Sequence, residues 1–219
     1  MRNDLISIIL IFLIFIFLIW VIKDKIKNNK WFIEGMEGKS KIILTGDNVL
    51  NNIDYVKKDN IRDLMEKERG IVIAETGATI NKLEQQLNLI PKKFNNIGTK
   101  IFISIGANDI YDHYKNNYKA DYKKIDDMYK KYKNILNKFK KKYNKVRLIL
   151  CDTFHGTLED DFKPVYDKWN EKIYEYGEIH NHKIFKLSKI LNKKLIEYKI
   201  EPNKEGGEII VKHIIKEKY

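Results

Sequence analysis

Short apolar runs that alternate with helical patterns most constrain the fold of this chain. Between these runs, apolar residues recur at three- and four-residue steps, which is typical of amphipathic helices. Strands separated by helices at this spacing favour a parallel sheet covered on both faces. The pattern predicts a three-layer α/β/α domain with a parallel five-stranded sheet over residues 41–219. We expect strands within 41–46, 70–77, 100–106, 145–154 and 182–188, and helices within 60–69, 78–90, 114–145, 164–180 and 206–218.

The segment before this domain has a different character. Residues 5–22 are uncharged and contain one polar residue, Ser7. At about 1.5 Å per helical residue the run covers roughly 27 Å, close to the hydrocarbon thickness of a bilayer. A cleaved signal peptide and a core helix are the alternatives. No small-residue cleavage site follows the run, and core helices are rarely apolar on every face. We therefore expect a single-pass membrane anchor.

Flanking charge predicts the orientation of this anchor. Four lysines, Lys23, Lys25, Lys27 and Lys30, follow the span directly, against Arg2 and the terminal amine in residues 1–4. The positive-inside rule places the domain on the cytoplasmic side of the membrane. The expected layout is an N-terminal tail (1–4), a transmembrane helix (5–22), a lysine-rich linker (23–40) and the α/β domain (41–219).

The net charge of +12 indicates attraction to a negatively charged partner, either nucleic acid or an anionic membrane. The lysines are spread along the chain without a nucleic-acid-binding motif, so we do not expect nucleic acid to be bound. Attraction to anionic lipid headgroups is the simpler consequence for a tethered domain. The single cysteine, Cys151, excludes an internal disulfide and a multi-cysteine metal site. We expect neither a metal nor a cofactor.

Short polar residues and glycines gather where the predicted strands end, in "TGDN", "ETGAT", "GAND" and "DTFHG". Ligand sites of such folds lie beyond the carboxyl ends of the strands. Three groups there could donate hydrogen bonds: the backbone N–H groups of Asn48 and Gly77, and the side-chain amide of Asn108. Donors that converge on one point would make an oxyanion hole.

These blocks, with "IEPNKEGG" near the C-terminus, resemble the SGNH (GDSL) hydrolase superfamily in order and position. The resemblance covers roughly residues 41–215 and implies an SGNH (flavodoxin-like) α/β/α fold with a serine-hydrolase site. "LTGDNVLNN" with "IEPNKEGG" is similar to SGNH-type proteins of large DNA viruses. The resemblance also implies roles for single residues. Those that match the superfamily's supporting and oxyanion positions are Gly46, Asp47, Gly77, Gly106, Asn108 and Asp109.

The positions of the catalytic triad do not match. Asn48 stands where the superfamily has its nucleophilic serine, Tyr198 where it has aspartate, and Glu201 where it has histidine. Serine hydrolases that lose triad members keep only about 10³–10⁴-fold acceleration over water. The resemblance thus implies a retained oxyanion group beside a triad that is lost.

Several residues keep a second interpretation. Asn48 could be an ordinary turn residue, and Asn108 with Asp109 could brace a loop. Glu201 could activate a water molecule or merely cap a helix. Cys151 and His155 could form a displaced nucleophile and base, although a lone cysteine in "LILC" suits a buried strand.

The expected function is a membrane-anchored, catalytically impaired SGNH-hydrolase-like protein that binds an acyl, ester or glycan-type ligand. One alternative is an active esterase in which Glu201 activates a water molecule. Another is a basic module that binds anionic lipid or nucleic acid.

Overall fold

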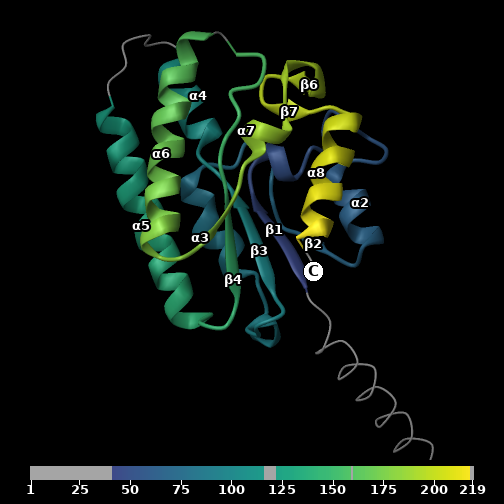
Figure 1. Ribbon diagram of the computed structural model, residues 1–219, viewed down its shortest axis with the longest axis vertical. Helices are drawn as coiled ribbons and strands as arrows, with labels where there is room; N and C mark the ends of the chain where they lie inside the picture. Colours follow the sequence, from purple (N-terminus) through teal and green to yellow (C-terminus); the bar gives the residue numbers. More distant parts are fainter. Residues whose placement is uncertain (1–40, 116–121, 159, 218–219) are drawn as a thin grey trace, which may run out of the picture. The chain divides into compact units, whose positions relative to one another are not determined.

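The computed structural model describes residues 41–115, 122–158 and 160–217. A five-stranded parallel sheet forms the centre of the domain, with strand order β2-β1-β3-β4-β5 (Figure 1). The prediction of a parallel five-stranded sheet is confirmed, and the order is that of flavodoxin-like folds. The strands are β1 (Ile42–Gly46), β2 (Ile71–Val72), β3 (Lys100–Ser104), β4 (Arg147–Cys151) and β5 (Lys183–Phe185).

Helices cover both faces of this sheet and complete the three predicted layers. Helices α2 and α8 pack together on one side, and α3, α5 and α6 lie on the other (Figure 1). The helices are α2 (Ile61–Lys67), α3 (Ile80–Asn88), α4 (Ala107–Tyr114), α5 (Lys123–Lys142), α6 (Lys163–Ile179), α7 (Leu187–Ile190) and α8 (Lys204–Lys216). Short 3₁₀ turns are η1 (Asn48–Leu50), η2 (Lys92–Phe94), η3 (Asp160–Phe162) and η4 (Lys193–Leu195).

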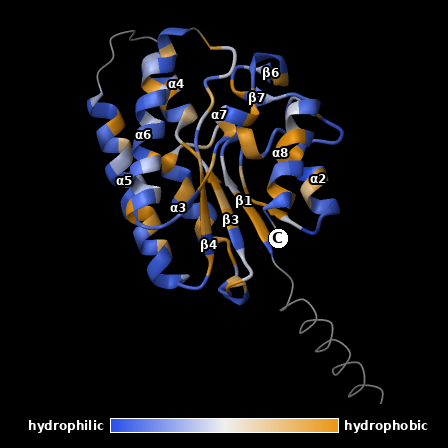
Figure 2. Cartoon of the chain, viewed as in Figure 1, coloured by the Kyte–Doolittle hydropathy of each residue, from blue (hydrophilic) through white to orange (hydrophobic). Residues whose placement is uncertain are grey.

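The core is continuous because the central strands β1, β3 and β4 are mostly apolar and are buried over nearly their whole length. Every residue of β1 is buried, and so are the last four residues of β3 and of β4. The strands appear as an apolar band between helices whose outer faces are hydrophilic (Figure 2). Helix α5 buries an apolar stripe and exposes its lysines, as its periodicity predicts.

Some element bounds differ from the prediction. Strand β2 has two residues, but the chain beyond it stays beside β1, where the Glu75 N–H donates to the Gly46 carbonyl at 3.0 Å. The predicted helix 114–145 is shorter, and a separate helix, α4, starts within the "GAND" block. An antiparallel hairpin of β6 (Ile196–Tyr198) and β7 (Glu201–Pro202) has no counterpart in the prediction.

Within residues 41–115, 122–158 and 160–217, no helix is both long and apolar enough to cross a membrane. The predicted span, 5–22, lies outside the residues that the structure describes.

Gly46, the last residue of β1, gives a test of the fold. Its φ is +121°, and an added Cβ would lie 1.7 Å from the Ser104 carbonyl oxygen. We expect Gly46→Ala to lower the free energy of unfolding by several kcal/mol, because backbone atoms of β3 must move. Urea denaturation measures this loss.

Gly77→Ala is the matched control. Gly77 has φ +70°, but an added Cβ would meet nothing within 4 Å. That substitution should cost only about 1 kcal/mol, the strain of the left-handed backbone. Equal losses in the two variants would contradict the assigned contact between Gly46 and β3.

Candidate functional site

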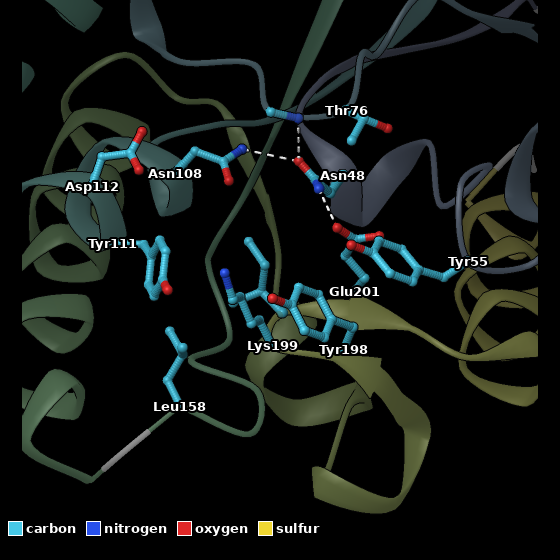
Figure 3. A pocket seen from close by; sticks show the side chains of 12 residues that line it. Asn48, Tyr55, Thr76, Asn108, Tyr111, Asp112, Leu158, Tyr198, Lys199 and Glu201 are labelled. Carbon is cyan, nitrogen blue, oxygen red and sulfur yellow. Dashed lines mark hydrogen bonds between the residues drawn. The ribbon is translucent and has the colours of Figure 1, made fainter. Parts of the chain in front are cut away.

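The side chain of Asn48 joins the blocks at the carboxyl edge of the sheet. Asn48 is the first residue of η1, directly after β1, and only 5% of it is exposed. Its side-chain oxygen accepts hydrogen bonds from the Gly77 N–H at 2.7 Å and from the Asn108 amide nitrogen at 3.0 Å. Its own amide nitrogen donates to the Glu201 carboxyl group (Figure 3). Four residues far apart in the sequence therefore meet at one amide.

This arrangement differs from the expected open hole. The donors of Gly77 and Asn108 do converge on one point, but the Asn48 side-chain oxygen occupies that point. The Asn48 amide therefore occupies the point that was expected to hold a ligand oxygen. A substrate carbonyl reaches these two donors only if the Asn48 side chain rotates away.

The Gly77 loop is held by residues of α4. The Asp109 carboxylate accepts from the Ile80 N–H at 3.0 Å, at the first turn of α3, where Thr79 provides no side-chain cap. Asn108 also donates to the Ala78 carbonyl at 3.0 Å. Asn108 thus fits both interpretations, because it contacts Asn48 and also holds the Gly77 loop. Asp109 fits only the second, because its bond is to the loop and not to Asn48. Burial raises the pKa of the Asp109 carboxyl to about 6.

Gln86 positions the end of β1, and the sequence analysis missed it. Its side-chain oxygen accepts from the Thr45 hydroxyl and the Gly46 N–H, both at 2.7 Å, and its nitrogen donates to the Gly46 carbonyl at 2.9 Å. The side chain is completely buried. The sequence did hold one indication of its role. Gln86 follows Leu83 by three residues, so it is a polar residue on the apolar face of α3.

Glu201 lies on β7, opposite Asn48, and is 4% exposed. The Asn52 amide donates to the Pro202 carbonyl at 3.3 Å and accepts from the Ile61 N–H at 2.5 Å, which holds this strand beside η1. Burial raises the pKa of Glu201 to about 7, against the Asn48 hydrogen bond, which lowers it. The second carboxyl oxygen has no hydrogen-bond partner among the described residues.

Tyr198 does not act on Glu201 as a triad aspartate acts on histidine. It is 43% exposed, and its ring stacks on Tyr55 with the centroids 5.0 Å apart. Tyr198 and Glu201 pair through the backbone of the β6–β7 hairpin, but in the described part of the chain no hydrogen bond joins their side chains. Glu201 is therefore oriented by Asn48 and not by the residue at the aspartate position.

A cavity of about 260 Å³ opens in front of Asn48 and Glu201. Tyr55, Tyr111 and Tyr198 line it, as Figure 3 shows. The Lys199 ammonium lies 4.1 Å from the Tyr111 ring centroid and 4.8 Å from that of Tyr198, within cation–π range. Hydrogen bonds to these two tyrosines raise the pKa of Lys199. The lining thus combines aromatic faces with hydroxyl, amide, carboxyl and ammonium groups.

Asp47 and Gly106 lie next to the site without lining the cavity: Asp47 directly follows β1, and Gly106 directly precedes α4. Asp47 is completely buried and accepts from the Val49 N–H and the Ser104 hydroxyl, each at 3.3 Å. Burial raises its pKa to about 7, and one of its oxygens lacks a partner among the described residues. Gly106 has φ +109°, and an added Cβ would lie 2.6 Å from the Trp169 ring.

The alternative pair Cys151 and His155 lies outside the cavity lining. Cys151 is completely buried in β4, and burial raises the pKa of its thiol well above the ordinary value. Its neighbour Asp152 accepts from Ser188 and Tyr174, so it braces α7. The described residues contain no group of three or more metal-binding side chains.

The domain is similar in structure to solved lipolytic proteins. A GDSL-like lipase from Bacteroides thetaiotaomicron superposes with a TM-score of 0.63 at 14% identity, covering 82% of this chain and 87% of that chain. A member of the lipolytic G-D-S-L family from Veillonella parvula gives 0.61 at 18% identity, covering 80% and 96%. The fold is that of the GDSL hydrolases.

Catalytic mutants of an acetylxylan esterase from Geobacillus stearothermophilus share this GDSL fold. One of them has a TM-score of 0.58 at 17% identity and covers 82% of this chain and 94% of that chain. No protein-family model matches the sequence. No curated protein matches it.

The buried carboxyl of Asp47 predicts a pH dependence of stability. Its pKa is about 7 in the folded protein against an ordinary 3.8, so the folded state holds the proton more tightly. Its contribution to stability is full below about pH 4 and is lost as the pH rises through about 7. Asp47→Asn should therefore gain stability relative to the wild type between pH 5 and 8, by on the order of a few kcal/mol.

Chemical denaturation at a series of pH values measures the difference between the two proteins. Asp127→Asn, at an exposed position of α5, is the control. A difference between Asp47→Asn and the wild type that stays constant with pH would contradict the assignment.

Proposed function

We propose that this chain is a catalytically impaired member of the SGNH hydrolase superfamily whose cavity binds an acyl, ester or glycan-type ligand. The observation that carries the proposal is the Asn48 side-chain oxygen, bound to the donors of Gly77 and Asn108. A site whose stabilising donors are already engaged has little left for a transition state.

The missing nucleophile supports the same conclusion. The nitrogen of a carboxamide is a poor nucleophile because its lone pair is delocalised, and Asn48 has no hydroxyl to activate. In the acetylxylan esterase, single mutants replace a serine, an aspartate and a histidine, and the last two lie three positions apart. Tyr198 and Glu201 have the same spacing here, which supports their assignment to the aspartate and histidine positions.

The cavity supports the choice of ligand class. Tyrosine rings offer apolar faces to a sugar ring or a short acyl chain, while their hydroxyls offer hydrogen bonds. About 260 Å³ suits a group of small size, such as an acetyl ester on one sugar unit. The superfamily's hydrolases act on such bonds, and here the same cavity holds the ligand without cleaving it.

Hydrolysis by Glu201 is the second candidate function. A carboxyl group with a pKa of about 7 and one unpartnered oxygen is suited to take a proton from water at neutral pH. The hydrogen bond from Asn48 to the other oxygen weighs against it, since it ties the base to the group that fills the hole. The first proposal accounts for both contacts.

The membrane anchor at 5–22 and a cytoplasmic domain remain part of the proposal. They are supported by the uncharged run and the lysines that follow it. The likeness to SGNH-type proteins of large DNA viruses likewise stays a prediction.

Hydrolysis assays on the full-length chain test the two candidates. We expect the wild type to cleave p-nitrophenyl acetate no faster than the exposed-site control Asn88→Ser in the same buffer, with both near the uncatalysed rate. Wild-type turnover that Glu201→Gln abolishes would overturn the pseudoenzyme proposal in favour of the second candidate.

Asn48→Ser tests whether the rest of the machinery survives. A serine at this position frees the Gly77 and Asn108 donors and places a hydroxyl within reach of Glu201. We expect this variant to react with a fluorophosphonate probe, and the wild type and Asn88→Ser to remain unlabelled. If labelling of Asn48→Ser persists after Glu201→Gln is added, Glu201 is not the base.

A further inference from the structure

The edge of the sheet opposite the cavity carries a concentrated positive charge. In a parallel sheet all strands start at one edge, and the helices that precede them end there. Two neighbouring connections at this edge, 89–100 and 140–147, hold eight lysines and arginines and no aspartate or glutamate. We call these two segments the basic edge. Its cations are Lys92, Lys93, Lys100, Lys140, Lys141, Lys142, Lys145 and Arg147.

The two segments form one continuous surface. They lead into β3 and β4, which are adjacent in the sheet, with Lys100 paired to Arg147. The Asn95 side chain joins them, accepting from the Lys145 N–H at 3.0 Å and donating to the Lys142 carbonyl at 3.5 Å. A backbone bond from the Arg147 N–H to the Thr99 carbonyl at 2.9 Å also joins them, so the two segments lie side by side.

Exposed apolar side chains lie among these charges. Leu89 is 64% exposed and Ile97 is 72% exposed, both within the first segment. Ile179, at the end of α6 and the same edge of the sheet, is 67% exposed. These are the three most exposed of the large hydrophobic residues that the structure describes. A surface that mixes cations with isolated large apolar side chains suits the interface of a membrane.

Ordinary helix capping explains only part of this pattern. Lysines in the last turn of α5 are favoured by the helix dipole. That effect does not extend to Lys145 or Arg147, and it gives no reason to expose Leu89 and Ile97. Among the described residues, none of the eight cations forms a salt bridge with a carboxylate side chain. Lys100 and Lys140 donate to backbone carbonyls, so the charge available to an external anion is chiefly that of the other six cations.

We propose that the basic edge lies against the surface of an anionic phospholipid bilayer, with Leu89 and Ile97 entering the headgroup region. The chain reaches β1 at this same edge, directly after the lysine-rich residues 23–40 and the uncharged run 5–22. Each lysine near an anionic surface strengthens binding by roughly fivefold. Two independent features, charge and exposed apolar area, thus favour the same partner.

Site-directed labelling of the full-length chain in lipid nanodiscs tests this contact. A nitroxide is attached at Ile97→Cys or, as the control near the cavity, at Ile53→Cys; the native Cys151 is buried and is not labelled. Accessibility to oxygen, which enters lipid, is compared with accessibility to a water-soluble nickel chelate. In discs of phosphatidylcholine with phosphatidylserine, the Ile97 label should move from the water-exposed to the oxygen-rich environment. The Ile53 label should stay in water.

Charge reversal separates electrostatic contact from other causes. Lys141→Glu with Lys145→Glu should return the Ile97 label to water, and so should high salt, which screens beyond roughly 3 Å at 1 M. The matched control, Lys193→Glu with Lys194→Glu at the cavity end, should leave it in lipid. A label that stays in water in anionic discs overturns the proposal. RNA binding that depends on Lys141 and Lys145, without lipid contact, would also overturn it by assigning the edge to nucleic acid.

Discussion

The amide of Asn48 is the interaction on which the arrangement of the site depends. It contacts the loop after β2 through Gly77, the start of α4 through Asn108, and the β6–β7 hairpin through Glu201. Among the described residues, no other side chain forms hydrogen bonds to all three of these segments. A carboxamide can do this because it accepts through its oxygen and donates through its nitrogen in a different direction, whereas a serine hydroxyl must accept and donate through one oxygen atom. An asparagine at this position therefore supplies a structural link between the three segments.

The groups around Asn48 explain why the link is rigid. Gln86 fixes the end of β1 from α3, Asp109 caps α3 from α4, and Asn52 holds β7 beside η1. Each is a polar side chain with bonds to backbone in a buried or half-buried setting, where an unmade bond is expensive. Asp47 and Glu201 are the exceptions: each has one oxygen without a partner among the described residues, and a pKa of about 7. Buried carboxyl groups with raised pKa values concentrate at functional sites.

Most of the fold follows from residue patterns that act locally. The apolar runs around Ile43, Phe102 and Ile149 predict the central strands. The helices between these runs predict that the strands are parallel. The direction of the Asn48 side chain does not follow from such patterns, because it is fixed by partners 29, 60 and 153 residues away. The β6–β7 hairpin was missed because its strands, of three and two residues, are too short to show a periodic pattern. Gln86 was visible only as a polar residue on an apolar stripe.

The parallel sheet gives the domain two unlike ends. Cations and exposed apolar side chains gather where the strands begin, and the cavity opens where they end. A five-residue strand such as β3 separates the two by roughly 16 Å before any loop is added. With the basic edge on a bilayer, the cavity points into the surrounding solution, beyond the reach of an acyl chain still embedded in that bilayer. Topology alone then selects for ligands that are dissolved, or carried by soluble molecules, over the lipids underneath.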